Sequence, residues 1–197
     1  KIKTQPNRSY GEILKDIISC ADLAIEYSGI SRFDLRHIGV GCPGAVDPKT
    51  GIVHYASNLN FVDAPLGADL KQEFRLPVYI ENDANAAALG EWLAGAAKNA
   101  KNAVIITLGT GIGAGIIING RLYSGSNCCG GEIGHTVIQV DGEPCPCGRN
   151  GCFEAYCSAT ALVRMTRKAI SENPDSGLEK AALDEGRISG RTAFSAM

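Results

Sequence analysis

The sequence Gly131-Glu-Ile-Gly-His135, with Cys145-Pro-Cys-Gly-Arg-Asn-Gly-Cys-Phe-Glu154 after it, decides how the rest of this chain is interpreted. The second motif places three cysteines within eight residues, and its two glycines allow the backbone to turn between them. Residues 136–140 alternate like a strand and end in an Asp141-Gly142 turn. Three cysteines and one histidine are a recurrent ligand set for a closed, tetrahedral zinc site. The pattern therefore predicts a structural metal, with the candidate ligands His135, Cys145, Cys147 and Cys152.

Two other interpretations of this cluster stay open on spacing alone. Cys145 and Cys147 are separated by one residue, which gives poor disulfide geometry, but either could pair with Cys152 in an oxidising compartment. His135 could be a partly buried histidine without a metal. The spacing C-x-C-x4-C differs from the commoner C-x2-C pair, so the residue types favour zinc without excluding the alternatives.

The composition limits the classes of function. The 197 residues carry 19 Lys and Arg against 21 Asp and Glu, and a net charge of −2 gives no electrostatic case for nucleic acid or a membrane surface. No apolar run approaches the roughly 20 residues that span a bilayer, and the first residues lack the apolar segment of a secretory signal. The cysteines outside the cluster are scattered, as free thiols are in a reducing compartment. We therefore expect a cytoplasmic globular protein.

Hydrophobic periodicity predicts an alternation of helices and strands. Helices are expected at residues 10–27, 66–74, 82–92, 153–170 and 178–185, and strands at 37–41, 52–55, 76–81, 103–107, 116–118 and 121–123. Asn119-Gly120 is a strong signal for a type I′ hairpin. The polar residues 98–102 are the expected crossing between an N-terminal α/β lobe, residues 1–100, and the start of a C-terminal lobe, residues 101–197. The chain opens in mid-flow and closes in what reads as an unfinished helix, so we expect part of a longer protein.

Asp83 lies where the strand at 76–81 meets an alanine-rich helix. Asp and Asn are favoured helix N-caps, so position alone favours a capping role for Asp83.

A glycine-rich stretch, Leu108-Gly-Thr-Gly-Ile-Gly-Ala-Gly115, lies between two predicted strands. It lacks the Gly-Lys-Ser/Thr of a P-loop, and no helix follows it as in a dinucleotide fingerprint. It could be only a tight turn, or its backbone N–H groups could approach phosphate oxygens as a nest does.

Together these motifs resemble the ROK family of repressors, open reading frames and sugar kinases. The resemblance rests on the two motifs quoted first, on LPVYIENDANAAALGE at 76–91 and on LGTGIGAG at 108–115, and it extends over most of the chain. It implies the two-lobed, ribonuclease H-like α/β fold of the actin-like ATPase and sugar kinase superfamily. The Asp-x-Gly-Gly-Thr loop that opens ROK kinases and the closing helices of their large lobe are absent, so we expect an incomplete fold and an incomplete ATP site.

The resemblance implies roles for individual residues. Asp83 becomes the catalytic base, which reverses the preference for a helix cap. The ATP phosphates, with Mg²⁺, would be held by Gly109, Thr110, Gly111 and Gly113. Structural Zn²⁺ would be held by His135, Cys145, Cys147 and Cys152. The sugar would contact Gly44, Asn58, Asn82, Asp83, Glu132, His135 and Glu154.

The expected function is glucokinase-like phosphorylation of a hexose hydroxyl by ATP. The alternatives are a kinase for N-acetylmannosamine, N-acetylglucosamine, fructose or allose, or a sugar-responsive ROK repressor. Only a repressor, with a helix-turn-helix outside this chain, would bring nucleic acid as a partner. We expect the full-length protein to be a homodimer or homotetramer with no membrane partner, and this chain alone to be inactive. Cys128-Cys129 receives no interpretation.

Overall fold

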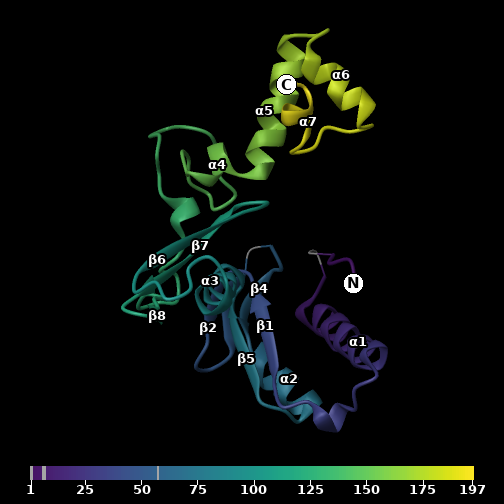
Figure 1. The fold of residues 1–197 in the computed structure, drawn as a ribbon, viewed down its shortest axis with the longest axis vertical. Helices are drawn as coiled ribbons and strands as arrows, with labels where there is room; N and C mark the ends of the chain where they lie inside the picture. Colours follow the sequence, from purple (N-terminus) through teal and green to yellow (C-terminus); the bar gives the residue numbers. More distant parts are fainter. Residues whose placement is uncertain (1, 6–7, 57) are drawn as a thin grey trace. The chain divides into compact units, whose positions relative to one another are not determined.

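The structure is a computed structural model that describes residues 2–5, 8–56 and 58–197 (Figure 1). The chain forms two compact units. The first comprises Lys1–Val104 and Gly115–Gly130, and the second Ile105–Ala114 and Gly131–Met197. A lobe boundary near residue 100 stays a prediction.

The first unit contains α1, the longest helix of the described residues, and the parallel strand pair. Its helices are α1 Tyr10–Ser28, η1 Arg32–Asp34, α2 Leu66–Phe74 and α3 Asp83–Ala94. Its strands are β1 Ile38–Cys42, β2 Ala45–Asp47, β3 Ile52–Ala56, β4 Phe61–Ala64 and β5 Val78–Asn82. A further sheet consists of β6 Ala103–Leu108, β7 Ile112–Ile118 and β8 Arg121–Leu122, in the order β6-β7-β8.

The parallel pairing of β1 with β5 brings two separate loops to one edge of a sheet (Figure 1). Cys42 pairs with Asn82 at the carboxyl ends of both strands. Because both strands end there, the loop after β1 and the start of α3 are neighbours. Ligands of α/β sheets bind beyond the carboxyl ends of the strands, so this edge is a candidate binding site. Strands β2, β3 and β4 form a separate antiparallel sheet.

The hydrophobic core of the first unit lies between α1, α2 and these strands. Helix α1 begins at a capping box of Ser9 and Glu12 and ends at Gly29 in the left-handed conformation. Tyr10 meets Phe61 edge to face at 5.2 Å between ring centroids. Each fully buried large apolar side chain contributes about 1.5–3 kcal/mol. The largest of these are Phe61, Leu66, Leu70, Ile80, Val46 and Val53.

The glycine-rich stretch is mostly strand, which corrects the prediction that a strand begins only at residue 116. Strand β7 starts at Ile112, so the turn itself is limited to residues 109–111. Gly115 serves helix packing: a Cβ there would lie 2.2 Å from the Cβ of Ala88 and 3.0 Å from the carbonyl oxygen of Ala84. The small residues of α3 and this glycine let the helix lie close against the strand. The hairpin after β7 has the predicted type I′ character, because Asn119 and Gly120 have φ of 53° and 69°.

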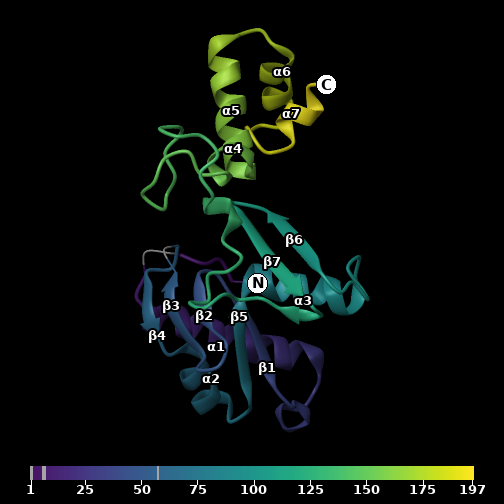
Figure 2. The same ribbon diagram turned by 90° about the vertical axis from the view of Figure 1, so that its left-hand side faces the viewer.

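The second unit ends in helices that pack on one another (Figure 2). Its elements are η2 Ile133–His135, α4 Glu154–Cys157, α5 Ala159–Glu172, α6 Gly177–Asp184 and α7 Thr192–Ser195. The Glu185 carboxylate accepts hydrogen bonds from the hydroxyls of Ser189, Thr192 and Ser195, which joins the last two helices. Among the described residues, no helix is long and apolar enough to cross a membrane.

Two predicted elements of this unit are wrong. Residues 136–140 form no strand: Val137 makes only an isolated bridge to Cys152, because this segment runs beside the irregular loop of the second motif. The predicted helix 153–170 is broken at Ser158, whose backbone is extended at φ −78° and ψ 164°. The Ser158 hydroxyl accepts the N–H of Ala161 at 3.1 Å, so the serine ends one helix and caps the next.

Candidate functional site

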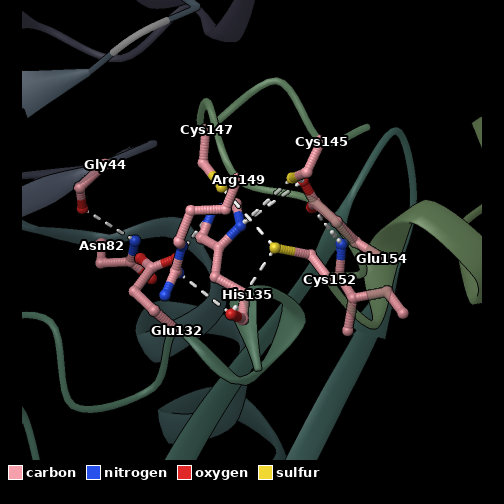
Figure 3. Close-up of polar contacts among 10 residues, drawn as sticks. Gly44, Asn82, Glu132, His135, Cys145, Cys147, Arg149, Cys152 and Glu154 are labelled. Atoms are coloured by element: carbon pink, nitrogen blue, oxygen red, sulfur yellow. Dashed lines mark hydrogen bonds and ion pairs between the residues drawn. The ribbon is translucent and has the colours of Figure 1, made fainter. Parts of the chain in front are cut away.

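The predicted metal ligands come together in the second unit (Figure 3). The ring nitrogens of His135 and the sulfurs of Cys145, Cys147 and Cys152 offer ligand atoms that all lie within 4.8 Å of one another. His135 ends the short helix η2, and the cysteines come from a loop closed by a hydrogen bond from the Cys145 N–H to the Arg149 carbonyl at 2.9 Å. Cys145 and Cys152 are buried, and Cys147 is exposed.

Two of the distances between these ligand atoms match a tetrahedral metal site. The sulfurs of Cys147 and Cys152 are 3.6 Å apart, and the sulfur of Cys145 is 3.6 Å from His135 Nδ1. Bonds of about 2.3 Å to sulfur and about 2.1 Å to nitrogen place tetrahedral ligands about 3.5–3.8 Å apart. A disulfide requires about 2.05 Å, and all eight cysteines are free thiols, so the disulfide alternative is not supported.

Arg149, which the sequence analysis overlooked, supplies positive charge to the cluster. Its guanidinium donates to the His135 carbonyl at 3.0 Å. Burial opposes ionisation of Cys147, but hydrogen bonds from the backbone and side chain of Arg149 lower the pKa of Cys147 to about 6. Burial raises the pKa of Cys145, and a hydrogen bond from its thiol to Glu154 acts in the same direction. The sequence signal for this role was an arginine between the candidate thiolate ligands. A zinc ion bound by three thiolates and one histidine carries a net negative charge, which a nearby arginine can balance.

The predicted sugar contacts of this unit surround the imidazole of His135. Nδ1 lies on the side of the thiols, 3.6 Å from Glu154 Oε1, and Nε2 lies 3.9 Å from Glu132 Oε2. A metal bound at Nδ1 would leave Nε2 for a fixed hydrogen-bond partner. Glu132, His135 and Glu154 thus form one polar group, whereas any contact with a sugar stays a prediction.

Asn82, not Asp83, caps helix α3. Asn82 Oδ1 accepts the N–H of Asn85 at 3.0 Å, and Asp83 is the first helical residue. The N-cap interpretation of Asp83 is therefore wrong. The Asp83 side chain is exposed, and its Oδ1 accepts the N–H of the adjacent Ala84 at 2.9 Å.

A second bond from Asn82 ties the loop after β1 to this helix start (Figure 3). Asn82 Nδ2 donates to the carbonyl of Gly44 at 3.0 Å. Gly44 has φ of 93°, and a Cβ there would lie 2.1 Å from the carbonyl oxygen of Tyr55, so only glycine fits. The sheet edge therefore gathers Gly44, Asn82 and Asp83.

The network behind Asp83 was not foreseen from the sequence. Glu81 Oε1 accepts the N–H of Asn82 and the Nδ2 of Asn85, each at 3.0 Å. Asn85 is 4% exposed, and its Oδ1 has no partner within the part of the chain that the structure describes. Burial raises the pKa of Cys42 to about 11, and the nearby Asp83 carboxylate adds to the effect. A polar side chain inside an alanine-rich helix was the signal for Asn85.

The remaining predicted residues lie on turns and on β7. Gly109 and Gly111 form the turn before β7, where the Gly109 N–H donates to the Gly111 carbonyl at 3.0 Å, and Thr110 between them is exposed. Gly113 lies within β7. Asn58 is exposed in the turn between β3 and β4. Gly44, Asn58, Asn82 and Asp83 belong to the first unit; Gly109, Thr110, Gly111, Gly113, Glu132, His135 and Glu154 belong to the second.

A sequence profile of the ROK family matches residues 2–193 of this chain. The chain belongs to the ROK family. Among curated ROK relatives, the glucokinase of Halalkalibacterium halodurans is 42% identical over 185 residues, which are 93% of this chain and 56% of that protein. The xylose repressor of Bacillus subtilis is 42% identical over 154 residues, which are 78% of this chain and 40% of that repressor.

Solved ROK structures give the same assignment. A ROK family glucokinase from Streptomyces griseus, in complex with glucose and AMPPNP, matches with a TM-score of 0.85 and 36% identity, over 99% of this chain and 61% of that one. A ROK family transcriptional regulator matches with a TM-score of 0.73 and 30% identity, over 83% of this chain and 41% of that one. These likenesses confirm the predicted α/β class and sugar kinase fold. The ROK chain described here spans 56% of the first relative and 61% of the first structure.

Proposed function

We propose that this ROK chain is part of a kinase that transfers the γ-phosphate of ATP to a hydroxyl of a hexose, glucose being the first candidate. The observation that carries the proposal is the Asp83 carboxylate, exposed at the carboxyl edge of the β1–β5 pair and released from helix capping by Asn82. The 42% identity to a glucokinase supports it. So does the structural likeness to a glucokinase that holds glucose and AMPPNP.

Asp83 would act as the general base. In phosphoryl transfer the protein mainly positions the reactants, and a carboxylate accepts the proton of the attacking hydroxyl. Asn82 fixes the backbone on both sides of this carboxylate, since its amide holds α3 through Asn85 and the loop after β1 through Gly44. The base would therefore sit on a rigid helix terminus, as accurate proton transfer requires. Asn58 would reach the same sugar from its turn.

Glu132, His135 and Glu154 would recognise the sugar hydroxyls. Their carboxylate oxygens and the imidazole Nε2 would form hydrogen bonds to the sugar hydroxyls. A sugar that lacks one of these hydroxyls would leave a polar group of the site unpaired, so such a site strongly rejects it. Zn²⁺ held by His135, Cys145, Cys147 and Cys152 would fix the imidazole tautomer and stabilise the loop. The gathering of these four ligand atoms within 4.8 Å of one another supports zinc here as a structural metal.

The phosphates of ATP, with Mg²⁺, would bind at Gly109, Thr110, Gly111 and Gly113. The backbone at 109–111 is a tight turn without large side chains, so a phosphate oxygen could approach the N–H groups of Thr110 and Gly111, whereas the Gly109 N–H donates to the Gly111 carbonyl. The complete ATP site would need sequence beyond this chain, and we expect residues 1–197 alone to be inactive. A cytoplasmic homodimer or homotetramer stays a prediction for the full-length protein.

The second candidate function is a sugar-responsive repressor. It is favoured by the 42% identity to a xylose repressor and by the likeness to a ROK transcriptional regulator. Sugar binding at the same residues would then control DNA binding by a further domain. The Asp83 carboxylate is exposed and does not cap α3, which favours the kinase, because a repressor needs no general base.

The test is a coupled assay of ATP consumption by the whole protein against glucose, N-acetylmannosamine, N-acetylglucosamine, fructose and allose. Replacing Asp83 by Asn should lower kcat by about 10²- to 10⁴-fold while the melting temperature and sugar affinity stay near the parent values. The control is Asp47→Asn, which removes a carboxylate at the end of β2, outside the proposed site. Near-normal kcat in Asp83→Asn refutes the base, and sugar binding without ATP consumption favours the repressor.

A further inference from the structure

Glu154 divides its two carboxylate oxygens between two loops of the second unit (Figure 3). Oε1 lies 3.1 Å from the Cys145 sulfur and accepts the thiol proton, which a metal bound at Cys145 would displace. Oε2 accepts the N–H of Ile112 at 3.3 Å, where β7 leaves the turn at residues 109–111. The Glu154 side chain is only 14% exposed. Glu154 follows the proposed ligand Cys152 by two residues, so its bond to Ile112 joins the loop assigned to phosphates with the loop assigned to metal and sugar.

The glycine at position 111 is explained by this carboxylate. A Cβ on Gly111 would lie 2.4 Å from Glu154 Oε2 and 3.5 Å from its Cδ, and no other heavy atom of the described chain would come within 4 Å. The φ of Gly111 lies outside the left-handed region, so the backbone itself accepts an L side chain. The obstacle is the far end of a flexible side chain, which can move aside.

We propose that Glu154 is a positioning residue that fixes the phosphate turn to the metal-binding loop, and that Gly111 leaves the space its carboxylate needs. A side chain at position 111 would push the carboxylate out of its place, breaking the bond to Ile112 and moving the group away from His135. A change in the phosphate turn would then impair sugar recognition, and loss of Glu154 would impair ATP binding. The kinetic consequences rest on the proposed hexose kinase function, whereas the contact itself does not.

The experiment is a double-mutant cycle in the whole protein with Gly111→Ala, Glu154→Ala and the combined variant. Gly111→Ala should raise the KM for the hexose by about 10- to 100-fold, the size of a lost charge-assisted hydrogen bond. In the Glu154→Ala background the same change should have no further effect, because the added methyl group has nothing to displace. Glu154→Gln keeps an acceptor for the Ile112 N–H, so it should preserve the KM for ATP that Glu154→Ala raises. Gly90→Ala is the matched control, since a Cβ there meets nothing within 4 Å.

If Gly111→Ala folds, either of two results overturns the inference. One is a Gly111→Ala variant whose KM rises for ATP but not for the hexose, as expected if the glycine serves only the phosphate turn. The other is additivity of Gly111→Ala and Glu154→Ala in melting temperature. The double-mutant cycle in melting temperature needs no enzymatic activity. If the protein phosphorylates no hexose, the proposed function is refuted, but this cycle still tests whether Gly111 and Glu154 interact. Should Gly111→Ala fail to fold, equal KM values for ATP in Glu154→Ala and Glu154→Gln refute the link.

Discussion

Replacing Asn82 by Ala tests whether one amide holds the edge of the β1–β5 pair together. The amide oxygen caps α3 by accepting the N–H of Asn85, and the amide nitrogen donates to the carbonyl of Gly44, each at 3.0 Å. Alanine removes both bonds and leaves the backbone N–H of Asn85, a residue only 4% exposed, without its acceptor.

The expected cost follows from these two bonds. Loss of an N-cap side chain costs about 1 kcal/mol, and loss of a second hydrogen bond costs about 0.5–1.5 kcal/mol. The opening free energy at the start of α3 should therefore fall by about 2 kcal/mol, which corresponds to about 30-fold faster exchange of the Asn85 amide proton. Native-state hydrogen exchange measures this locally and requires no two-state unfolding of the whole protein.

Asn82→Asp separates the two contributions. A carboxylate can still accept the Asn85 N–H, and its charge is favourable at a helix N-terminus, but it cannot donate to Gly44. Exchange at residue 85 should stay near the parent rate, while the loop at Gly44 loses protection. An Asn82→Ala variant with parental exchange at residue 85 would refute the capping geometry, and unchanged protection at the loop in both variants would refute the link to Gly44.

Three further predictions concern the metal, the loop after β1 and the isolated chain. Zinc should be present at one ion per chain, and Cys147→Ser should lower both the zinc content and the melting temperature. Cys157 is exposed and outside the cluster, so Cys157→Ser should change neither. Elemental analysis that finds no zinc in protein purified without chelator would contradict the site. Gly44→Ala should destabilise the protein by at least about 1–3 kcal/mol, because an alanine there would have a positive φ and would collide with the carbonyl oxygen of Tyr55. The control is Gly39→Ala, since a Cβ at Gly39 meets nothing within 4 Å. A Gly44→Ala variant with the parental melting temperature would exclude this close approach. Residues 1–197 alone should self-associate and show no kinase activity, because exposed strand edges invite pairing; catalysis by a monodisperse sample in light scattering and kinase assays would overturn this.

Local chemistry allowed much of the fold to be predicted from the sequence. The apolar periodicity of residues 10–27 predicted α1, which spans Tyr10–Ser28, and Asn119-Gly120 predicted the hairpin, because these signals act over a few residues and depend little on the rest of the chain. The spacing of Cys145, Cys147 and Cys152 similarly predicted a ligand cluster, since thiols so close in sequence remain close in space.

Errors arose where a segment depends on a partner. Residues 136–140 alternate like a strand but lack a strand to pair with, so they follow the metal-binding loop instead. Ser158 breaks a helix that periodicity predicts as continuous, because its hydroxyl can cap the second half. Both outcomes depend on competition between local alternatives, which the apolar pattern does not record.

The roles of the polar residues were decided by tertiary structure. Whether Asn82 or Asp83 caps α3 depends on where β5 ends, and the parallel register with β1 then delivers the Gly44 carbonyl to the Asn82 amide. Sequence reasoning had no means of linking Gly111 to Glu154, which lie far apart along the chain. Residue types and short spacings determined what chemistry this chain can offer, whereas the packing of strands and loops determined which group each side chain serves.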